Sequence, residues 1–589
     1  MRPARLGLRG TPARRVLASI LSLMFCPLAL AQDPQQDSQA ANPGTTNLGT
    51  ATTVRGMVRN GASGEPLRHA LVRINGDASA GALTDGNGRF EIDGVPEGPQ
   101  DFMVIKPGFI DQMEAATDAR DQHGFGHNVM VISQMGDVVF SMVPLNSIEG
   151  QVQLSTGDMA EGIQVNLLRR TVQDGRAVWQ TQASTKTNID GVYRFGQLPD
   201  GLYAVYTEPT MESNAATNLV ESGSANKVER EGYACTFYPD ARDLAGAAKI
   251  HAGGGEQIQA NISLLLEPFH LVTARVMMAR KNVGAGGNVA VQVTDGQGHA
   301  LPYPAQFDAA SQTVQAALPD GTYTFRATLQ SDFAHLMVIR NGVAVDSAPT
   351  VPRITRGEAG FAIAGHALSG LQIPMSESVG NSIQVILNRN PNGGAQTGDP
   401  SIHVMLSQAG GGLDDGIVQS YADGSGFAPL QTQQASPGRY WIHTAIGPKT
   451  VCEGSFTTGG ASLAREPLVM TSAGTTAPLV LTLRDDCAAL TLSLPGSIGV
   501  AAGEEPFYTV YVIPDFDSTD DVVPQTLRAS TGGRIKLEGL TPGNYHVYTF
   551  DRPVALEYRN PNVLASLPGQ AVTLAPGADA ELVVEAPPR

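Results

Sequence analysis

The feature that most constrains the fold is a short turn phrase that recurs along the chain. Residues 198–203 read LPDGLY and residues 318–323 read LPDGTY. Aligning the chain on this phrase reveals five copies, whose turn glycines are Gly98, Gly201, Gly321, Gly438 and Gly543. These glycines recur every 103 to 120 residues, which is about the length of one immunoglobulin-sized β-sandwich. We therefore expect about five such units in tandem.

Each copy has the pattern of a strand, a turn and a second strand. In the first copy, Phe90 and Ile92 alternate with polar residues, so both lie on one face of a strand. Pro96 and Gly98 follow. Proline ends a strand ladder because it lacks a backbone N–H, and glycine accepts the positive φ values of a turn. A tyrosine follows the turn in the later four copies, as in the tyrosine corner of β-sandwiches. We interpret the phrase as a structural corner, because a binding site would have to be shared by all five copies.

Length and composition support this all-β interpretation. The 589 residues exceed what one hydrophobic core holds. Glycine is abundant, with 66 residues, and only 16% of the residues are charged, which favours many turns over charge-paired helices. The net charge of −17 opposes sequence-independent binding of nucleic acid, which depends on Lys and Arg neutralising phosphates.

The first 31 residues have the pattern of an export signal. Five arginines between Arg2 and Arg15 precede the apolar run 16–31, which ends in Ala29-Leu30-Ala31. This pattern predicts a signal peptide cleaved after Ala31, followed by a flexible leader over 32–52. No later stretch is long and apolar enough for a transmembrane helix. We therefore expect an exported chain, periplasmic or extracellular, with no membrane span after cleavage.

Three cysteines remain after the predicted cleavage, namely Cys235, Cys452 and Cys487. Exported compartments permit disulfides. Cys452 and Cys487 lie 35 positions apart, and we predict that they pair, which would add roughly 4 kcal/mol through loop-closure entropy. The alternative is that all three are small, buried apolar residues.

The first repeat carries further motifs before its corner. They are G-x-V, G-x-P-L-x-x-A-x-V and T-D-x-x-G-x-F-x-I, followed by the V-P-x-G turn. Together they resemble the carboxypeptidase regulatory-like domain, a seven-stranded transthyretin-like β-sandwich classed with carbohydrate-binding-like folds. The resemblance is good over 53–145 and partial over 147–268, and it implies a fold rather than a chemistry. The matching residues of the first repeat are Gly56, Val58, Gly64, Pro66, Leu67, Ala70, Val72, Thr84, Asp85, Gly88, Phe90, Ile92, Val95, Pro96 and Gly98.

The repeat, the composition and the resemblance together predict an all-β fold. After the signal peptide (1–31) and leader (32–52), we expect a tandem array of about five Ig-like or transthyretin-like antiparallel β-sandwiches. Their predicted limits are 53–145 for the carboxypeptidase regulatory-like sandwich, then 146–268, 269–378, 379–486 and 487–589.

Motifs for catalysis are missing from the sequence. None of the eleven histidines is followed by Glu at the third position, and HExxH is absent, so the zinc carboxypeptidase site is not present. No G-x-S-x-G elbow and no phosphate-binding glycine loop between a strand and a helix occurs. The sequence therefore predicts no enzyme, no cofactor and no metal-binding residue.

Two segments contain metal-ligating residue types without the required pattern. His123 and His127 are separated by glycines and lack a helical pattern, so we interpret them as a loop pair. The segment DFDSTDD (515–521) has Asp520 and Thr526 where a calcium loop needs Gly and Glu. We interpret it as a solvated acidic loop, and the alternative is a looser calcium site between sandwich loops.

Sugar binding usually needs exposed aromatic rings, on which the apolar faces of sugars stack. The candidates for such a ligand platform are Trp179, Tyr233, Phe237 and Tyr238. The alternative is that these rings pack in the core or on a sheet face.

The sequence thus predicts a non-catalytic exported protein that acts in binding or scaffolding. Its expected partners are polysaccharides or cell-envelope proteins, with carbohydrate binding suggested only by the fold resemblance. The alternative is an accessory protein-interaction subunit of an exported enzyme or transport system. A third class, an enzyme with an unrecognised site, requires chemistry that no motif indicates.

Overall fold

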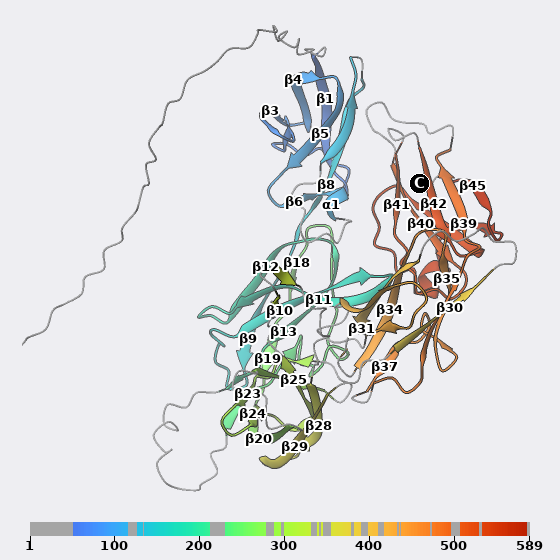
Figure 1. Ribbon diagram of the computed structural model, residues 1–589. Helices are drawn as coiled ribbons and strands as arrows, with labels where there is room; N and C mark the ends of the chain where they lie inside the picture. The colour runs from blue at the N-terminus through green and yellow to red at the C-terminus, as the bar shows by residue number, and fades with distance from the viewer. Residues whose placement is uncertain are drawn as a thin grey trace, which may run out of the picture. The chain divides into compact units, whose positions relative to one another are not determined.

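The structure is a computed structural model, and it describes most of the chain from Ala51 to Glu585. The regular secondary structure of the described residues is almost entirely strand (Figure 1), and the helices α1 (Gln112–Ala115) and α2 (Pro561–Leu564) are single turns. The fold is therefore all-β, as predicted. The predicted signal peptide, its cleavage after Ala31 and most of the leader lie outside the described residues. So do 116–125, 134, 212–229, 279–287, 296–299, 331–337, 341–342, 346–354, 378–381, 390–398, 410–417, 433–434, 436–437, 472–473, 496–506, 529–532 and 586–589.

The first sandwich consists of two four-stranded sheets. Their inner faces form one core, in which Val54, Val58, Phe102 and Phe140 are buried. The first sheet has the order β4 (Arg89–Pro96), β1 (Ala51–Asn60), β8 (Val138–Pro144) and β6 (Phe109–Asp111). The second has the order β3 (Asp77–Leu83), β2 (Leu71–Ile74), β5 (Gly98–Ile105) and β7 (His127–Val131).

Two of the motif residues of this sandwich have clear packing roles. A Cβ atom on Gly56 would lie 2.2 Å from the Val138 carbonyl oxygen and 2.6 Å from the Phe90 ring, so only glycine fits. Gly150 has the same role in the second sandwich, where a Cβ would lie 2.1 Å from the Ala260 carbonyl oxygen. These close approaches explain the G-x-V motif physically.

The threonine of the T-D motif links two loops of the first sandwich. The buried Thr84 hydroxyl donates a hydrogen bond to the Leu67 carbonyl at 2.6 Å and accepts one from the Ala70 amide at 2.8 Å. Thr187 makes the equivalent pair of hydrogen bonds in the second sandwich. The partial resemblance over 147–268 therefore extends to the hydrogen bonds of this turn.

The second sandwich carries a long hairpin that becomes important below. One sheet has the order β11 (Arg176–Lys186), β10 (Gln164–Gln173), β13 (Gly201–Thr207) and β16 (Thr236–Phe237), with β17 (Ile250–Ala252) also paired to β13. The other has the order β12 (Val192–Leu198), β9 (Asn146–Leu154) and β18 (Gln257–Gln259), with β19 (Ile262–Leu264) also paired to β9. Strands β10 and β11 pair along their whole length from Gln164 to Lys186.

The third group of strands forms one continuous sheet. Its order is β14 (Thr210–Met211), β15 (Arg230–Tyr233), β20 (Leu266–Met278), β29 (Leu368–Glu377), β28 (Thr355–Ile363), β25 (Gly321–Gln330), β21 (Asn288–Thr294) and β22 (Ala300–Leu301). Strand β24 (Thr313–Leu318) pairs with β20 and with β23 (Ala305–Asp308), and β26 (Val338–Arg340) pairs with β27 (Val343–Val345). The predicted limit at 268/269 falls inside β20, and one buried cluster joins this group to β13 and β16 of the second sandwich. The domain limits therefore stay predictions.

The fourth and fifth sandwiches each have two separate sheets. In the fourth sandwich, the first sheet has the order β33 (Leu430–Gln431), β30 (Ser382–Asn388), β38 (Leu479–Arg484), β35 (Cys452–Thr458) and β36 (Ala461–Ser462). Its second sheet has the order β32 (Val418–Ser425), β31 (Ser401–Gln408), β34 (Gly438–Gly447) and β37 (Leu468–Met470). In the fifth sandwich, the first sheet has the order β42 (Arg534–Leu540), β39 (Ala488–Ser493) and β45 (Asp579–Val583). Its second sheet has the order β41 (Gln525–Arg528), β40 (Phe507–Pro514), β43 (Gly543–Phe550) and β44 (Gln570–Leu574). Each has a buried core of its own.

The repeated turn phrase is a corner that moves the chain from one set of strands to another. In the first sandwich β4 pairs with β1, whereas β5, directly after the turn, pairs with β2. The same change of partner occurs at the other four copies. Tyr203 and Tyr545 each donate a hydrogen bond from Oη to the carbonyl oxygen four residues earlier, at 2.7 and 2.6 Å. The structure thus confirms that the phrase is a structural corner, and the corners of the second and fifth sandwiches carry the tyrosine hydrogen bond.

Candidate functional site: a polar hollow and a three-sandwich junction

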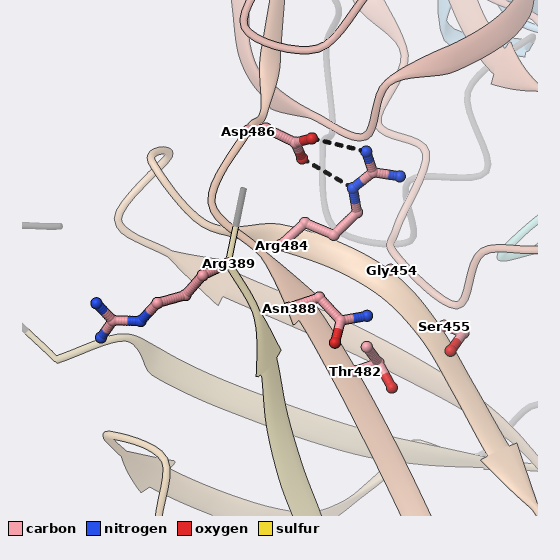
Figure 2. Close-up of a pocket in the computed structure, with 7 residues that line it drawn as sticks. All are labelled: Asn388, Arg389, Gly454, Ser455, Thr482, Arg484 and Asp486. Atoms are coloured by element: carbon pink, nitrogen blue, oxygen red, sulfur yellow. Dashed lines mark hydrogen bonds and ion pairs between the residues drawn. The ribbon is translucent and has the colours of Figure 1, made fainter. Parts of the chain in front are cut away.

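The first candidate site is a hollow of about 400 Å³ on the fourth sandwich. We call it the polar hollow. Figure 2 shows that the Arg484 guanidinium binds the Asp486 carboxylate directly through two parallel hydrogen bonds of 2.8 Å each. Asn388 and Thr482 add amide and hydroxyl groups, while Arg389 points away from the Arg484–Asp486 pair (Figure 2). The full lining is Asn388, Arg389, Gly454, Ser455, Thr482, Arg484 and Asp486.

A bulge in β35 helps to form this hollow. The pairing of β35 with β38 shifts between Glu453 and Ser455, so Gly454 is the extra residue. A Cβ on Gly454 would lie 3.1 Å from the Thr482 carbonyl oxygen. The side chains of the lining are hydrogen-bond donors and acceptors without an aromatic ring. The hollow can therefore hydrogen-bond a small polar ligand but offers no ring for stacking.

The second candidate site begins at the tip of the β10–β11 hairpin. Asp174 and Gly175 join the two strands with φ values of +46° and +66°. Two consecutive positive φ values define a type I′ turn, for which Asp-Gly is a favoured pair. A Cβ on Gly175 would lie 2.6 Å from the Tyr558 ring of the fifth sandwich, so the tip contacts that ring closely.

Side chains of two other sandwiches bind the Asp174 carboxylate. From the fifth sandwich, Tyr558 Oη donates to Oδ1 at 2.5 Å and Arg559 Nε donates to Oδ2 at 3.1 Å. From the fourth, His443 Nδ1 lies 2.9 Å from Oδ2. Burial opposes ionisation of Asp174, but the hydrogen bond from His443 and the charge of Arg559 outweigh it and lower the pKa. Asp174 is therefore a buried carboxylate with its charge compensated.

Residues Tyr558 and Arg559 are positioned by a segment that covers the outer face of β40 and β43. Tyr511, Ile513, Tyr548 and Leu556 form a small buried cluster there with Tyr558. Tyr511 Oη donates to the Val554 carbonyl at 2.6 Å, which fixes the segment to the sheet. The fifth sandwich thus presents the two Asp174 partners from a packed surface.

Arginines of the hairpin make further contacts with both sandwiches. The Arg176 guanidinium lies 3.7 Å from the centre of the Trp441 ring, and its Nη2 donates to the Ala464 carbonyl at 3.1 Å. This is a cation–π contact with the fourth sandwich. Burial, with the nearby charge of Arg559, lowers the pKa of Arg176 to about 10. Arg170 donates to Glu557 of the fifth sandwich at 2.5 Å.

The acidic segment 515–521 is bound to the fourth sandwich, which corrects its interpretation as a solvated loop. Thr519 is fully buried, and its amide and hydroxyl donate to the two Glu453 carboxylate oxygens at 2.8 and 2.7 Å. The Thr444 hydroxyl also donates to Glu453, at 2.6 Å. Burial raises the pKa of Glu453, and burial with the nearby Glu453 raises the pKa of Asp520 to about 7. Thr519, the one threonine of the acidic segment, makes this docking possible, and the sequence pattern alone did not indicate it.

We call this set of contacts the junction. It comprises Asp174 and Arg176 of the second sandwich, His443, Thr444 and Glu453 of the fourth, and Thr519, Asp520, Asp521, Tyr558 and Arg559 of the fifth. Sequence reasoning missed all of these as a site. The Asp-Gly pair at 174–175 between two alternating segments was the one local signal of a hairpin tip.

His443 is bonded on both ring nitrogens. Nε2 lies 2.7 Å from Ser407 Oγ, and Nδ1 lies 2.9 Å from Asp174 and 3.2 Å from Asp521. This is the connectivity of a Ser-His-Asp triad. Ser407 and His443 are only 5% and 4% exposed, however, so a substrate cannot reach either side chain from solvent without a change of structure. We therefore interpret the chain of hydrogen bonds as structural.

The ligating atoms of Asp174, His443 and Asp521 lie within 4.8 Å of one another. The donor set does not fit a cation well, because the Arg559 guanidinium already lies 3.1 Å from the Asp174 oxygen that faces His443. A divalent ion there would face a fixed positive charge at hydrogen-bonding distance. We therefore interpret these residues as a salt-bridge cluster.

The predicted aromatic platform is not a common exposed surface. Tyr233 and Phe237 are 4% and 3% exposed and belong to hydrophobic clusters, so the alternative of core packing describes them. Trp179 is half-buried with Lys249 Nζ 5.6 Å from its ring centre, and Tyr238 packs partly against the core of the second sandwich. All four rings lie in or against hydrophobic clusters. The polar neighbours of Trp179 in the sequence gave no sign of this packing.

The remaining candidate residues lie elsewhere. Cys452 and Cys487 form a disulfide with a Cα–Cα distance of 5.8 Å, next to the polar hollow, and Cys235 is a buried thiol. His123 lies outside the described residues. His127 lies in strand β7 rather than in a loop, 2.6 Å from the Asp111 carboxylate, which corrects that part of the interpretation.

Comparisons with known proteins support the fold of the first sandwich. The sheets, corners and buried cores described above define the class of tandem β-sandwich proteins. Residues 53–128 match the family model of the carboxypeptidase regulatory-like domain, which confirms the resemblance over that sandwich. No curated protein matches the sequence. No helix among the described residues has the length and apolar character needed to cross a bilayer.

Three solved structures give similarities over larger parts of the chain. The Bacillus anthracis TIE protein is 10% identical over 91% of this chain and 74% of its own, with a TM-score of 0.15. The shaft pilin SpaA from Lactobacillus rhamnosus GG is 12% identical over 37% of this chain and 98% of its own, with a TM-score of 0.17. Two B repeat units of the Staphylococcus aureus collagen-binding protein are 10% identical over 69% of this chain and 93% of their own, with a TM-score of 0.13. At these TM-scores we base no argument on the similarities.

Proposed function

We propose that the protein is an exported, non-catalytic multi-domain β-sandwich protein that acts in binding or scaffolding. The observation that carries this proposal is the binding of Asp174, at a hairpin tip of the second sandwich, by His443 of the fourth and Arg559 of the fifth. Buried ion pairs often add little net stability, and we infer that this one specifies the geometry of the contact instead. Such a junction holds recognition surfaces of different sandwiches in a defined arrangement, which is what a scaffold requires.

The non-catalytic part of the proposal can be tested at Ser407, because its connectivity to His443 is that of a nucleophile and base. A fluorophosphonate probe reacts with activated serines by forming a covalent bond to Oγ. We expect no labelling of the purified protein, since Ser407 is buried. Labelling that disappears in Ser407→Ala, and persists in a Ser401→Ala control from the same strand, would show an enzyme instead.

For the ligand, the polar hollow supports a polar class such as a polysaccharide, whose hydroxyl groups hydrogen-bond planar amide, carboxylate and guanidinium groups. The test is retention of the protein on insoluble polysaccharides and peptidoglycan, with soluble sugar as competitor. We expect competable retention that is lost in Asn388→Ala and Thr482→Val. The exposed Arg439→Ala, on the other sheet of the same sandwich, serves as the control. Retention that both hollow variants keep would move the glycan site elsewhere.

The alternative partner is a protein of the cell envelope, in which case the chain acts as an accessory subunit of an exported enzyme or transport system. Absence of retention on every polysaccharide would favour it. Crosslinking in the native envelope would then be expected to capture a defined partner. The same experiment tests export, because a chain found only inside the cytoplasm would contradict the proposal.

A further inference from the structure

We propose that the junction is a pH-sensitive coupling, which holds the second, fourth and fifth sandwiches together in mildly acidic solution and weakens as the pH rises past neutrality. This inference goes beyond the proposed function, and it does not depend on which ligand the protein binds. It rests on the position of three titratable groups, His443, Glu453 and Asp520, at contacts between sandwiches.

The geometry makes each of these groups dependent on a closed junction. His443 of the fourth sandwich is 4% exposed and faces Asp174 of the second and Asp521 of the fifth. Glu453 is 3% exposed because Thr519 of the fifth sandwich covers it and donates two hydrogen bonds. Separation of the sandwiches would expose all these groups to water. Their protonation is therefore linked to closure.

His443 favours closure at low pH. Burial alone would lower its pKa, but the hydrogen bonds and charges of Asp174 and Asp521 raise it above the ordinary 6.5. A pKa that is higher in the closed state means that the closed state binds the proton more tightly. This contribution to closure is complete below pH 6.5 and is lost as the pH rises through the raised value.

Asp520 and Glu453 act in the same direction for a different reason. Burial raises the pKa of Asp520 from 3.8 to about 7, with Glu453 and Asp521 adding to the shift and Lys449 opposing it. Burial also raises the pKa of Glu453 above 4.5. In an open junction both groups would ionise near their ordinary values. Their contributions are therefore complete below about pH 4 and are lost as the pH rises, for Asp520 by about pH 7.

The other charged groups of the junction limit this behaviour at its two ends. The pKa of Asp174 is lowered from 3.8, so its contribution to closure is lost only in stronger acid. The pKa of Arg176 is lowered to about 10, and burial raises that of Tyr558, so both keep their charge state near neutrality. Arg559 stays charged throughout. The junction is therefore tightest near pH 4, and above this pH it weakens as the contributions of Asp520, Glu453 and then His443 are lost.

Two backbone amides report directly on the contact between the fourth and fifth sandwiches. The Thr519 amide donates to Glu453, and the Thr444 amide donates to the Thr519 carbonyl oxygen at 2.9 Å. Hydrogen exchange of both amides in the purified chain, corrected for the intrinsic pH dependence of exchange, measures the open population. We expect their protection to fall about a hundredfold or more between pH 5 and pH 8, since one pKa unit corresponds to a tenfold change.

Variants assign the effect to single groups. Asp520→Asn removes one titration, so the fall in protection between pH 5 and pH 7 should become shallower, and His443→Gln should remove the part above pH 6.5. The controls are Asp423→Asn and His403→Gln, which change an exposed His–Asp pair of the same fourth sandwich and should follow the wild type. Protection that does not change with pH would overturn the proposal, as would Asp520→Asn and His443→Gln profiles that both match the wild type. If a variant does not fold, the wild-type profile alone still decides whether protection depends on pH.

Discussion

The first sandwich and the junction are held together by different kinds of contact. In the first sandwich, glycines and a threonine with fixed spacings place strands within one continuous stretch of about 95 residues, as with Gly56 against Val138 and Thr84 against Leu67. In the junction, Asp174 meets Arg559 across 385 positions of sequence. The comparison shows that short motifs determine each sandwich, whereas the arrangement of sandwiches depends on a few buried charges that no motif marks.

Loss of Arg559 should have the largest effect on the junction. Arg559→Met keeps most of the side-chain volume but removes the nearer guanidinium partner of the buried Asp174 carboxylate, at 3.1 Å, and leaves Arg176 at 3.7 Å. Breaking a buried pair in this way costs about 3–5 kcal/mol. The measurement is urea unfolding followed by Trp441 fluorescence, in a Trp179→Phe background so that Trp441 is the single reporter. Arg534→Met, which changes an exposed arginine of the fifth sandwich, should cost less than about 0.5 kcal/mol.

Next in size is the disulfide beside the polar hollow. It closes a loop of 35 residues, and its removal should cost the fourth sandwich about 4 kcal/mol by loop-closure entropy. In urea unfolding, the Cys452→Ala/Cys487→Ala variant should have about the same free energy of unfolding as the wild type measured in reductant. If reductant leaves the wild type unchanged, and peptide mapping without reduction finds both thiols free, the pairing is wrong.

A smaller loss of stability is expected when the glycine of the G-x-V motif in the first sandwich is replaced. Gly56→Ala forces a Cβ against the Val138 carbonyl oxygen and the Phe90 ring, and overpacking of this kind typically costs about 1–3 kcal/mol. Gly86→Ala is the control, because a Cβ there meets nothing within 4 Å. Hydrogen exchange of strands β1 and β4 should rise in the first variant alone. Equal behaviour of the two glycines would remove the packing explanation of the motif.

The smallest effect concerns the tyrosine hydrogen bond at the corners of the second and fifth sandwiches. Tyr545→Phe and Tyr203→Phe each delete one hydrogen bond to a backbone carbonyl, which should cost about 1 kcal/mol. Thermal unfolding of the two variants should show similar shifts, because the two corners have the same geometry. A large cost at one position and none at the other would show that the corners are not equivalent.

The sequence predicted the fold because its signals are local. The corner phrase, the glycine of G-x-V and the Thr-Asp turn each act within one sandwich, so their spacing is enough to identify them. Two of the aromatic candidates, Tyr233 and Phe237, are buried, and nothing near them in the sequence shows that other strands cover them. The acidic segment 515–521 was misjudged likewise, since Glu453 and Thr444, which bind Thr519, lie more than 60 positions away.

The junction itself combines one local signal with several distant ones. The Asp-Gly pair indicates a hairpin tip at 174–175, and the structure has a type I′ turn there. What the tip contacts depends on Tyr558 and Arg559, whose position is set by packing on the outer face of β40 and β43. A pattern of alternating residues cannot reveal which outer face is covered.

The central claim is that the hairpin tip of the second sandwich lies against the fifth, and two matched glycines test it most directly. Gly175 and Gly162 both belong to the second sandwich and have φ values of +66° and +74°, so alanine brings similar backbone strain at each. Only at Gly175 would the added Cβ meet another sandwich, at 2.6 Å from the Tyr558 ring. We predict that hydrogen exchange of 515–521 and 556–560 increases in Gly175→Ala and stays at the wild-type level in Gly162→Ala. Unchanged exchange of both segments in Gly175→Ala would contradict the junction.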